Sequence, residues 1–273
     1  MKTYGIVGHP VTHSLSPAMH NAGIQYLKLE AEYRLFDIDP DDPENLANFC
    51  YETELNNIGG FSVTMPYKLT IMQYMDHYDP AARIIGSVNT VVNENSMLNG
   101  YNTDAMGAIQ ALREQSEIKR KKALVMGAGG AARAIIYTLK EFGADVHVFN
   151  RTTQRAEDLA DEFDVEPIEF RHIPQANFDI IVNATPVGSM PNSEESLLHA
   201  DQIPSHAVVM DVITNPIETQ LLKEAKKAGA TPISGERMLL HQAVGQFELW
   251  FGKKAPVKVM EKALYEELKK RSS

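Results

Sequence analysis

A run of glycines in the middle of the chain, Gly127-Ala-Gly-Gly130, constrains the fold more than any other feature of the sequence. It follows a short apolar run at residues 123–126 and precedes a segment in which apolar residues recur at helical spacing. Strand, glycine turn and helix in this order are the context of a dinucleotide-binding turn, because glycine lets the backbone approach a pyrophosphate and the N–H groups of the helix start face the anion. Ala132 stands where a third glycine is usual and is small enough for close packing. The pattern alone is weak, and an ordinary tight turn is the alternative.

Segments of strand character and of helix character alternate along the whole chain, in two successive series. In the first series we expect strands near residues 3–8, 33–38, 61–65, 88–92 and 97–101, and helices near residues 16–27, 43–57, 68–75 and 105–117. In the second series we expect strands near residues 123–126, 146–149, 179–183, 208–212 and 231–233, and helices near residues 131–142, 153–163, 217–228 and 236–250, with a last helix after Pro256. This alternation favours an α/β fold with largely parallel sheets, and two series predict two domains with a cleft between them.

The composition excludes several classes of function. The chain has 273 residues, of which 44% are hydrophobic and 23% are charged, as in a globular protein long enough for two domains. A net charge of −10 argues against nucleic acid as a partner, and no apolar run reaches the roughly 18 residues that a membrane span requires. The first residues are too polar for a signal peptide. We therefore expect a cytoplasmic protein.

Cysteine and histidine give no sign of a disulfide framework or of a metal site. Cys50 is the single cysteine, which fits a reducing compartment, and we expect it to be packed on the helix near residues 43–57. His9 and His13 are four residues apart, but Pro10 between them argues against a helical pair of metal ligands. No metal is therefore expected.

The residues after the second strand of the glycine-containing series indicate which dinucleotide binds. That strand ends in Asn150-Arg-Thr152, where folds that bind NAD usually carry an acidic residue for the ribose 2′-hydroxyl. Arg151 could instead pair with a 2′-phosphate, with Asn150 and Thr152 donating hydrogen bonds. A surface arginine at a strand end is the alternative, but the pattern favours NADP. The next strand ends in residues 183–188, a small polar loop of the kind that contacts a ligand in such folds.

Polar residues also lie at predicted strand ends and turns of the first series: Ser14, Ser16, Lys68, Asn89 and Asp104. Lys68 comes just after a predicted strand, and Asp104 lies at the junction of the two series, where it should face the cleft. A lysine and an aspartate at a cleft can hold a substrate hydroxyl and move its proton. Each could equally be a solvated side chain, so the residues alone leave this pair a candidate.

Taken together, these motifs resemble the shikimate dehydrogenase family, and the resemblance covers almost the whole chain. The matching segments, in order, are Ser14-Leu-Ser16-Pro17, Val63-Thr64-Met-Pro66-Tyr-Lys68, Gly86-Ser-Val-Asn89-Thr90, Asn102-Thr-Asp104, Gly127-Ala-Gly-Gly130, Asn150-Arg-Thr152, Asn183-Ala-Thr-Pro-Val-Gly188 and Gly235-Glu-Arg-Met-Leu-Leu-His-Gln242-Ala243. The last segment is highly specific to the family. The resemblance implies the reduction of 3-dehydroshikimate to shikimate with NADPH, in the pathway to chorismate and the aromatic amino acids.

The resemblance also implies a role for each matching residue. Lys68 and Asp104 would be the catalytic pair. The substrate would be bound at its carboxylate by Ser14 and Ser16, and at its ring hydroxyls by Thr64, Asn89 and Gln242. The residues implied for NADP(H) are Gly127, Ala128, Gly129, Gly130, Ala131, Asn150, Arg151, Thr152, Thr185, Gly235 and Met238. The implied domains are residues 1–103 for substrate and catalysis, residues 104–236 as a Rossmann-like NADP domain, and residues 237–273 as helices that return to the first domain.

Two residues depart from the family pattern. Thr214 stands where a tyrosine is usual beside the substrate, and Ser62 stands where an asparagine commonly precedes Val63. Both put the substrate preference in question, so a dehydrogenase of quinate as well as shikimate, with broader cofactor use, is an alternative. A protein that binds NADP(H) or a shikimate-like ligand without catalysis is another, although Lys68 and Asp104 argue against it. The sequence is compatible with a monomer and with a homodimer.

Overall fold

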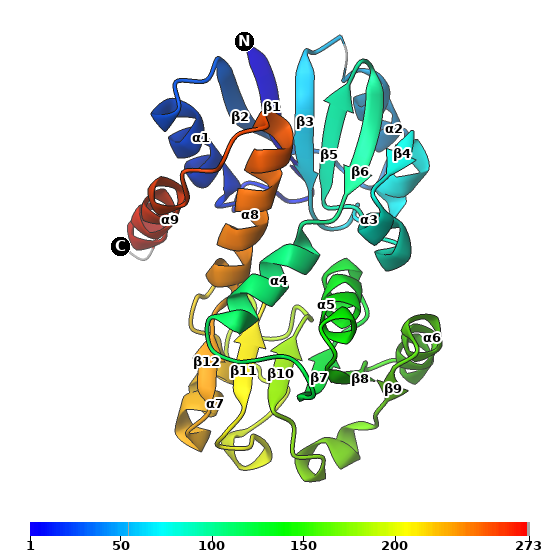
Figure 1. Ribbon diagram of the computed structural model, residues 1–273, viewed down its shortest axis with the longest axis vertical. Helices are drawn as coiled ribbons and strands as arrows, with labels where there is room; N and C mark the ends of the chain where they lie inside the picture. Colours follow the sequence, from blue (N-terminus) through cyan, green and yellow to red (C-terminus); the bar gives the residue numbers. More distant parts are fainter. Residues whose placement is uncertain (54, 272–273) are drawn as a thin grey trace. The chain divides into compact units, whose positions relative to one another are not determined.

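The computed structural model describes residues 1–53 and 55–271, and the chain forms two compact units (Figure 1). The first unit contains Met1–Thr103 and the chain from Gln242 onward, and the second contains Asp104–His241. The second unit is therefore an insertion into the first, and the return falls inside one helix, α8 (Gly235–Phe251). The predicted return, at residue 237, lies on the same helix, ahead of Gln242.

The first unit is built on a mixed six-stranded sheet with the strand order β2-β1-β3-β5-β6-β4. In chain order the strands are β1 (Lys2–Gly8), β2 (Ala31–Asp37), β3 (Ile58–Val63), β4 (His77–Tyr78), β5 (Thr90–Glu94) and β6 (Met97–Tyr101). β1 pairs in parallel with both β2 and β3, whereas β5 is antiparallel to β3 and to β6. The carboxyl ends of β1 and β3 therefore lie at the same edge of the sheet as the amino end of β5.

Helices cover this sheet on both faces. They are α1 (Ser16–Tyr26), α2 (Pro43–Tyr51), α3 (Pro80–Ile85), α9 (Val257–Arg271) and the carboxyl half of α8, with a 3-10 turn, η1, at Thr70–Tyr74. On one face Cys50 of α2 packs in a core with Phe61 and Ile71, which confirms that it is a packed residue. On the other face the Trp250 indole N–H donates to the Val91 carbonyl at 2.9 Å, so α8 lies directly against β5. α1 packs against α9 beside it (Figure 1).

The second unit has a fully parallel six-stranded sheet with the order β12-β11-β10-β7-β8-β9, which confirms the predicted Rossmann-like architecture. Its strands are β7 (Lys122–Met126), β8 (Asp145–Phe149), β9 (Glu166–Pro167), β10 (Ile180–Asn183), β11 (Val208–Asp211) and β12 (Thr231–Ile233). Its helices are α4 (Asp104–Arg113), α5 (Gly130–Glu141), α6 (Thr153–Phe163) and α7 (Gln220–Ala228), with 3-10 turns at Phe170–Gln175 and Ala200–Gln202. The chain runs from β7 outward in both directions, so the carboxyl end of β7 is the topological switch point where such sheets bind ligands.

β7 lies at the centre of this sheet because its side chains are apolar on both faces. Leu124 belongs to the core on one face and Val125 to the core on the other, and both are fully buried. Such a continuous apolar strand is typical of a parallel sheet covered by helices on both sides. It places the glycine run, which follows directly, at the middle of the sheet.

Three predicted helices differ from the structure in extent or type. The helix expected near residues 43–57 ends at Tyr51, because the Thr53 hydroxyl donates to the Cys50 carbonyl at 3.0 Å and competes with the backbone; residue 54 lies outside the described residues. The segment at residues 68–75 contains a 3-10 turn, because five residues are too few to offset the cost of nucleating an α-helix. The helix expected at residues 105–117 ends at Arg113.

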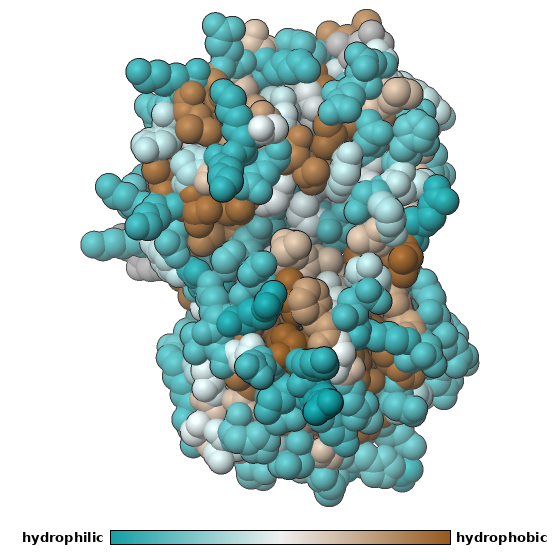
Figure 2. All heavy atoms as spheres, in the orientation of Figure 1, coloured by the Kyte–Doolittle hydropathy of each residue, from teal (hydrophilic) through white to brown (hydrophobic). Residues whose placement is uncertain are grey.

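The surface of each unit is largely hydrophilic. On the face shown in Figure 2, hydrophilic residues cover most of the surface and hydrophobic residues lie in separate patches. This distribution agrees with the net charge of −10. Within residues 1–53 and 55–271, none of the helices combines the length and the apolar character that crossing a membrane requires.

A buried carboxyl joins the ends of two neighbouring strands in the second unit. Asp211, at the end of β11, accepts hydrogen bonds from the Thr219 hydroxyl at 2.7 Å, from the Ile213 N–H at 3.1 Å and from Asn183 Nδ2 at 3.1 Å. Burial raises the pKa of the Asp211 carboxyl to about 6, although these hydrogen bonds oppose the shift. Asn183 ends β10, so this carboxyl fixes the start of the loop that follows.

The raised pKa of Asp211 predicts a loss of stability with rising pH. Between 3.8 and about 6 the folded protein keeps a proton that the unfolded chain releases, so the free energy of unfolding falls through this range. One pKa unit corresponds to about 1.4 kcal/mol, which gives a loss on the order of 3 kcal/mol. Asp211→Asn cannot ionise. In urea denaturation we expect its stability relative to the wild type to improve by about that amount between about pH 4 and about pH 7. An equal difference at both pH values would contradict this account.

Candidate functional site

The glycine run ends β7 and opens α5 in the second unit. Gly127 has a φ of +121°, and a Cβ there would lie 2.8 Å from the Ala184 carbonyl oxygen, so the position requires glycine. Gly129 is the extended N-cap of α5, and no described atom lies within 4 Å of the place that a Cβ would take. The first N–H groups of α5, which have no partner within the helix, therefore follow a stretch of backbone without a side chain, and this arrangement fits a pyrophosphate group.

Arg151 lies between β8 and α6, at the carboxyl end of the strand next to the glycine turn. Asn150 donates from Nδ2 to the Thr152 carbonyl at 3.0 Å and tightens this turn, and Thr152 is the N-cap of α6. Arg151 is exposed, and no carboxylate among the described residues pairs with it. A cation at this position fits the 2′-phosphate of NADP, whereas the 2′-hydroxyl of NAD is usually bound by an acidic residue.

The loop at residues 183–188 is held by its own side chains. The Thr185 hydroxyl donates to Asn183 Oδ1 at 2.7 Å and accepts the Val187 N–H at 3.1 Å, and Gly188 has a φ of +94°. Thr185 therefore shapes the loop at the carboxyl end of β10. Its contact with a cofactor stays a prediction.

Two further residues predicted for the cofactor lie in the first turns of α8. Gly235 is required by a close approach of the backbone, since a Cβ there would lie 2.4 Å from the Ile213 carbonyl oxygen and 2.6 Å from that of Val212. Met238 is buried in the core of the second unit. Both residues fix the start of α8 against the segment after β11, and their contact with a cofactor stays a prediction.

The residues predicted for the substrate belong to the first unit and lie around one edge of its sheet. Thr64 follows β3, and its N–H donates to the Val7 carbonyl of β1 at 2.8 Å. Ser14 and Ser16 follow β1 at the start of α1, where the Ser14 hydroxyl oxygen accepts the Ser16 N–H at 3.2 Å. Asn89 immediately precedes β5. The mixed topology of the sheet brings these chain segments together.

Asn89 and Gln242 form the centre of this edge. Asn89 Nδ2 donates to Gln242 Oε1 at 2.9 Å, and Asn89 Oδ1 accepts the backbone N–H of Thr103 at 2.7 Å. Asn89 is buried, and Gln242 is half-buried on α8. The structure thus brings two predicted substrate residues into contact although 153 positions separate them in the chain.

Three buried residues behind this pair, His20, Tyr33 and Gln246, were not identified from the sequence. Gln246 Oε1 accepts the Ser62 hydroxyl at 3.1 Å and lies 3.2 Å from His20 Nε2. Gln246 Nε2 donates to Gln242 Oε1 at 3.4 Å. The four-residue spacing of Gln242 and Gln246 on one predicted helix, which places them on the same face, is the signal that could have identified Gln246.

Burial keeps this group of residues neutral. It lowers the pKa of His20 to about 3, although the hydrogen bond with Gln246 favours the protonated ring. The Tyr33 ring stacks on the His20 ring with centroids 4.4 Å apart, and its hydroxyl is hydrogen-bonded to Ser62, at 2.6 Å, and to Ser16. Burial raises the pKa of the Tyr33 hydroxyl as well. These residues therefore orient the edge of the site without adding charge to it.

Lys68 belongs to the first unit, and Asp104 opens the second. Lys68 is half-buried, and its carbonyl accepts the Val88 N–H at 2.9 Å, next to Asn89. Asp104 is buried as the first residue of α4, where the helix dipole favours a carboxylate, and it directly follows Thr103, which Asn89 binds. The backbone of Lys68 and the residue before Asp104 are thus tied to the Asn89 edge. Their action as a pair stays a prediction.

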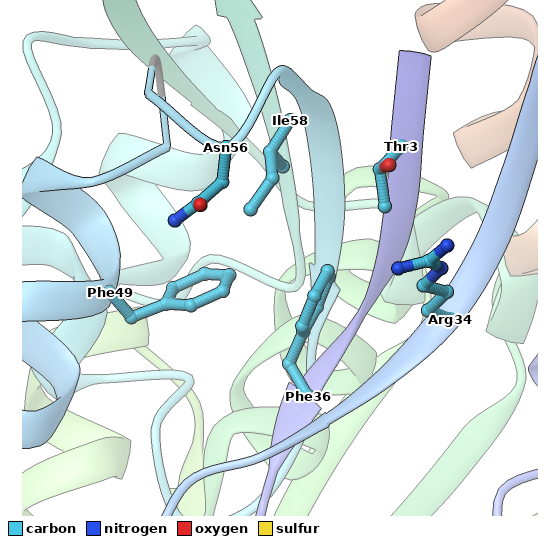
Figure 3. Close-up of a pocket in the computed structure, with 6 residues that line it drawn as sticks. All are labelled: Thr3, Arg34, Phe36, Phe49, Asn56 and Ile58. Carbon is cyan, nitrogen blue, oxygen red and sulfur yellow. The ribbon is translucent and has the colours of Figure 1, made fainter. Parts of the chain in front are cut away.

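A cavity of about 260 Å³ in the first unit contains none of the predicted site residues (Figure 3). It is lined by Thr3, Arg34, Phe36, Phe49, Asn56 and Ile58. Phe36 and Phe49 point toward each other with ring centroids 5.0 Å apart, and the Arg34 guanidinium is paired with the Glu32 carboxylate. Thr3 and Ile58 mark the amino ends of β1 and β3, opposite the Asn89 edge, so this cavity is not the candidate site. Over the described part of the chain, no three His, Cys, Asp or Glu side chains are grouped to hold a metal ion.

Comparison with known proteins gives matches along most of the chain. The family models described as "Shikimate dehydrogenase substrate binding domain", "Shikimate / quinate 5-dehydrogenase" and "Shikimate 5'-dehydrogenase C-terminal domain" match residues 6–91, 110–227 and 235–265. A shikimate dehydrogenase (NADP(+)) from Methanobrevibacter smithii is 42% identical over 278 residues, which cover 98% of this chain and 97% of the relative.

Two solved structures are similar over nearly the whole chain. A crystal structure of a shikimate dehydrogenase in complex with NADP+ has a TM-score of 0.92 at 40% identity and covers 98% of this chain and 96% of its own. The shikimate 5-dehydrogenase of Thermus thermophilus, in complex with NADP(H) and shikimate, has a TM-score of 0.90 at 37% identity and covers 97% and 99%. Sequence identities of about 40% over nearly the whole length show common descent as well as a common fold. The chain belongs to the shikimate dehydrogenase family.

Proposed function

We propose that the protein catalyses the NADPH-dependent reduction of 3-dehydroshikimate to shikimate, and the reverse oxidation, in the pathway to chorismate. The observation that carries the proposal is the Asn89–Gln242 amide pair at the sheet edge of the first unit, in a chain of this family. Amides, hydroxyls and one lysine around a single edge suit a carboxylate that carries several ring hydroxyls. The glycine turn and Arg151 of the second unit suit NADP(H).

The substrate is held by donors whose other hydrogen bonds are already made. The Ser14 hydroxyl oxygen accepts the Ser16 N–H, so its own proton is available for the substrate carboxylate. The Ser16 hydroxyl is hydrogen-bonded to the Tyr33 hydroxyl, so it binds the same carboxylate only by exchanging that partner. The Thr64 hydroxyl has no partner among the described residues and is available for a ring hydroxyl. Gln242 binds a ring hydroxyl with its Nε2 group. Asn89 Nδ2 already donates to Gln242 Oε1 at 2.9 Å and to the Thr103 hydroxyl oxygen at 3.0 Å, so Asn89 binds a second ring hydroxyl only by exchanging one of these partners.

NADP(H) is held by the second unit. The backbone at residues 127–131 binds the pyrophosphate, and residues 150–152 bind the adenosine 2′-phosphate. Thr185, Gly235 and Met238 lie at the ends of β10 and at the start of α8, where they support the nicotinamide end. When bound, NADPH supplies the hydride that the side chains of the protein cannot supply.

Lys68 and Asp104 handle the proton and the charge. As the substrate ketone becomes an alcohol, negative charge develops on its oxygen, and the Lys68 ammonium stabilises that charge and donates the proton. Asp104 orients Lys68 and accepts a hydrogen bond from the neighbouring substrate hydroxyl. In the oxidation direction the same lysine takes the proton back.

Replacement of Lys68 tests the assignment of the proton donor. Lys68→Met keeps the length and apolar body of the side chain and removes the ammonium. We expect kcat for 3-dehydroshikimate to fall by about 100- to 10,000-fold, the range for loss of a general acid, while the Kd for NADP+ stays close to that of the wild type. Steady-state assays at 340 nm and a cofactor titration measure the two values. A kcat near that of the wild type would exclude Lys68 from catalysis.

Replacement of Arg151 tests the assignment of the cofactor. Arg151→Ala should raise the KM for NADP+ by about 10- to 100-fold, because it removes a charge-assisted contact with the 2′-phosphate, and should leave the KM for NAD+ almost unchanged. Arg120→Ala is the matched control, since Arg120 is also exposed and belongs to the second unit but precedes β7, at the amino ends of the parallel strands. Equal effects on NADP+ and NAD+, or equal effects of the two substitutions, would argue against the assignment.

The function as a whole is tested by a matrix of substrates and cofactors. We expect the highest kcat/KM with shikimate and NADP+, and lower values with quinate or with NAD+. A similar kcat/KM for quinate and shikimate would instead identify a broader quinate/shikimate dehydrogenase. Tight binding of NADP(H) without turnover of either substrate would identify a non-catalytic binding protein.

A further inference from the structure

We propose that Gln246 is a positioning residue for the substrate: it fixes the side-chain amide of Gln242 with the Nε2 group, rather than the oxygen, available to the ligand. The inference rests on the proposed function, because it assumes that Gln242 binds a ring hydroxyl of the substrate. Gln246 would not be identified from contacts with the substrate, since it is buried and acts through Gln242.

The orientation of the amides in this group follows from one backbone donor. The Thr103 N–H can only donate, so the Asn89 atom 2.7 Å from it is the oxygen, Oδ1. The Thr90 hydroxyl donates to the same oxygen at 2.8 Å. Asn89 Nδ2 is therefore the atom that meets Gln242 at 2.9 Å, and the atom of Gln242 that it meets is Oε1.

Gln246 locks Gln242 in this orientation. Gln246 Nε2 lies within hydrogen-bond distance of three acceptors: the Thr90 hydroxyl oxygen at 3.2 Å, Gln242 Oε1 at 3.4 Å and the Asn89 carbonyl at 3.4 Å. If the Gln242 amide turned over, its NH2 group would meet the N–H donors of Asn89 and Gln246, and both hydrogen bonds would be lost. With Oε1 occupied, Gln242 Nε2 has no partner among the described residues. Gln242 therefore offers a ligand two donors, and its oxygen is withheld.

Gln246 is itself held from behind by two buried donors. Its Oε1 accepts the Ser62 hydroxyl at 3.1 Å and lies 3.2 Å from His20 Nε2. Because an amide oxygen can only accept, the neutral His20 ring carries its proton on Nε2. His20 Nδ1 is buried without a described partner, so no second contact pulls the ring toward another tautomer. The Asn89 backbone carbonyl, which can only accept, lies 3.4 Å from the other end of the Gln246 amide, so that atom is Nε2. The amide therefore has a single orientation, with Oε1 toward His20 and Nε2 toward Gln242.

The consequence for binding is a preference in polarity. Gln242 donates to a substrate hydroxyl, and the oxygen of that hydroxyl accepts. The proton of the hydroxyl therefore remains free for another acceptor. Without Gln246, Gln242 Oε1 keeps only the hydrogen bond from Asn89 Nδ2. The Gln242 amide can then turn over, so that its oxygen rather than its NH2 group meets the substrate. The affinity for substrate should fall, whereas the cofactor, which the second unit binds, should be unaffected.

A double-mutant cycle between Gln246 and Gln242 tests the inference. Gln246→Met has a similar volume and removes the amide. In the oxidation of shikimate by NADP+ we expect the KM for shikimate to rise about tenfold, as for one lost hydrogen bond, with the KM for NADP+ unchanged. In the background of Gln242→Met the same substitution should change the KM for shikimate by less than about twofold, because its effect passes through Gln242.

Asn93→Leu is the matched control. Asn93 donates from Nδ2 to the Ile58 carbonyl at 2.9 Å at the opposite end of the same sheet, so its replacement removes one amide hydrogen bond from the same unit without touching Gln242. We expect it to lower the Tm and to leave the KM for shikimate unchanged. If Gln246→Met fails to fold, Ser62→Ala removes one anchor of Gln246 and should raise the KM about two- to threefold, again only when Gln242 is present.

Each outcome decides between the two proposals. Coupled effects support the inference, and effects of equal size in both backgrounds overturn it, since Gln246 would then act on the fold alone. No change in the KM for shikimate on Gln246→Met also overturns it. If the wild-type protein does not oxidise shikimate at all, the proposed function fails and the inference fails with it. Activity in the wild type with additive variants removes the inference and leaves the function in place.

Discussion

The hydrogen bond from the Thr103 N–H to Asn89 Oδ1 is the interaction on which the arrangement of the first unit's edge depends. A backbone N–H can only donate and has no alternative rotamer or tautomer, so the Asn89 amide that binds it has one orientation. This orientation in turn determines which atom of Gln242 meets Asn89. The bond also lies where the chain leaves the first unit, one residue before Asp104. One buried contact therefore sets the polarity of the Asn89–Gln242 pair, and it lies one residue before the start of α4.

In the second unit the main constraint is the close approach of backbone segments, which requires glycine at several positions. Gly127 and Gly235 both stand where a Cβ would collide with a carbonyl oxygen, at 2.8 Å and 2.4 Å. Gly129 has the opposite surroundings, with open space around it. The first two glycines let segments of the unit approach each other, and the third leaves room for an anion at the start of α5. Their roles are distinct although two of them belong to one short motif.

The sequence predicts best those features that depend on local periodicity and on backbone chemistry. The apolar residues 123–126, the glycines after them and the helix that follows are all found as expected, because strand, turn and helix here leave separate local signals. The two-residue strands β4 and β9 are too short to produce a period. The 3-10 turn at Thr70–Tyr74 has the composition of a helix, and only its length decides its type.

In the candidate site, too, some residues could be identified from the sequence and others only from the structure. Gln242 and Asn89 are found through family motifs, but Gln246 and His20 have roles that exist only after α1, β5 and α8 have packed together. A glutamine in a helix and a histidine among apolar residues are unremarkable in the sequence. Their roles depend on tertiary contacts, since a buried amide needs hydrogen-bond partners for both its oxygen and its nitrogen.

Ser62 shows how this tertiary requirement bears on a departure from the family pattern. A serine hydroxyl has one proton and less reach than the asparagine amide that is common at this position, so it cannot satisfy several neighbours alone. Here it lies 2.6 Å from the Tyr33 hydroxyl and donates to Gln246 Oε1, and together these residues fill the buried space behind the substrate edge. Nothing in the structure explains Thr214. A change at Ser62 therefore affects the substrate through the orientation of Gln246 and Gln242, and its effect on substrate preference should depend on which hydroxyl of the ring must accept a hydrogen bond.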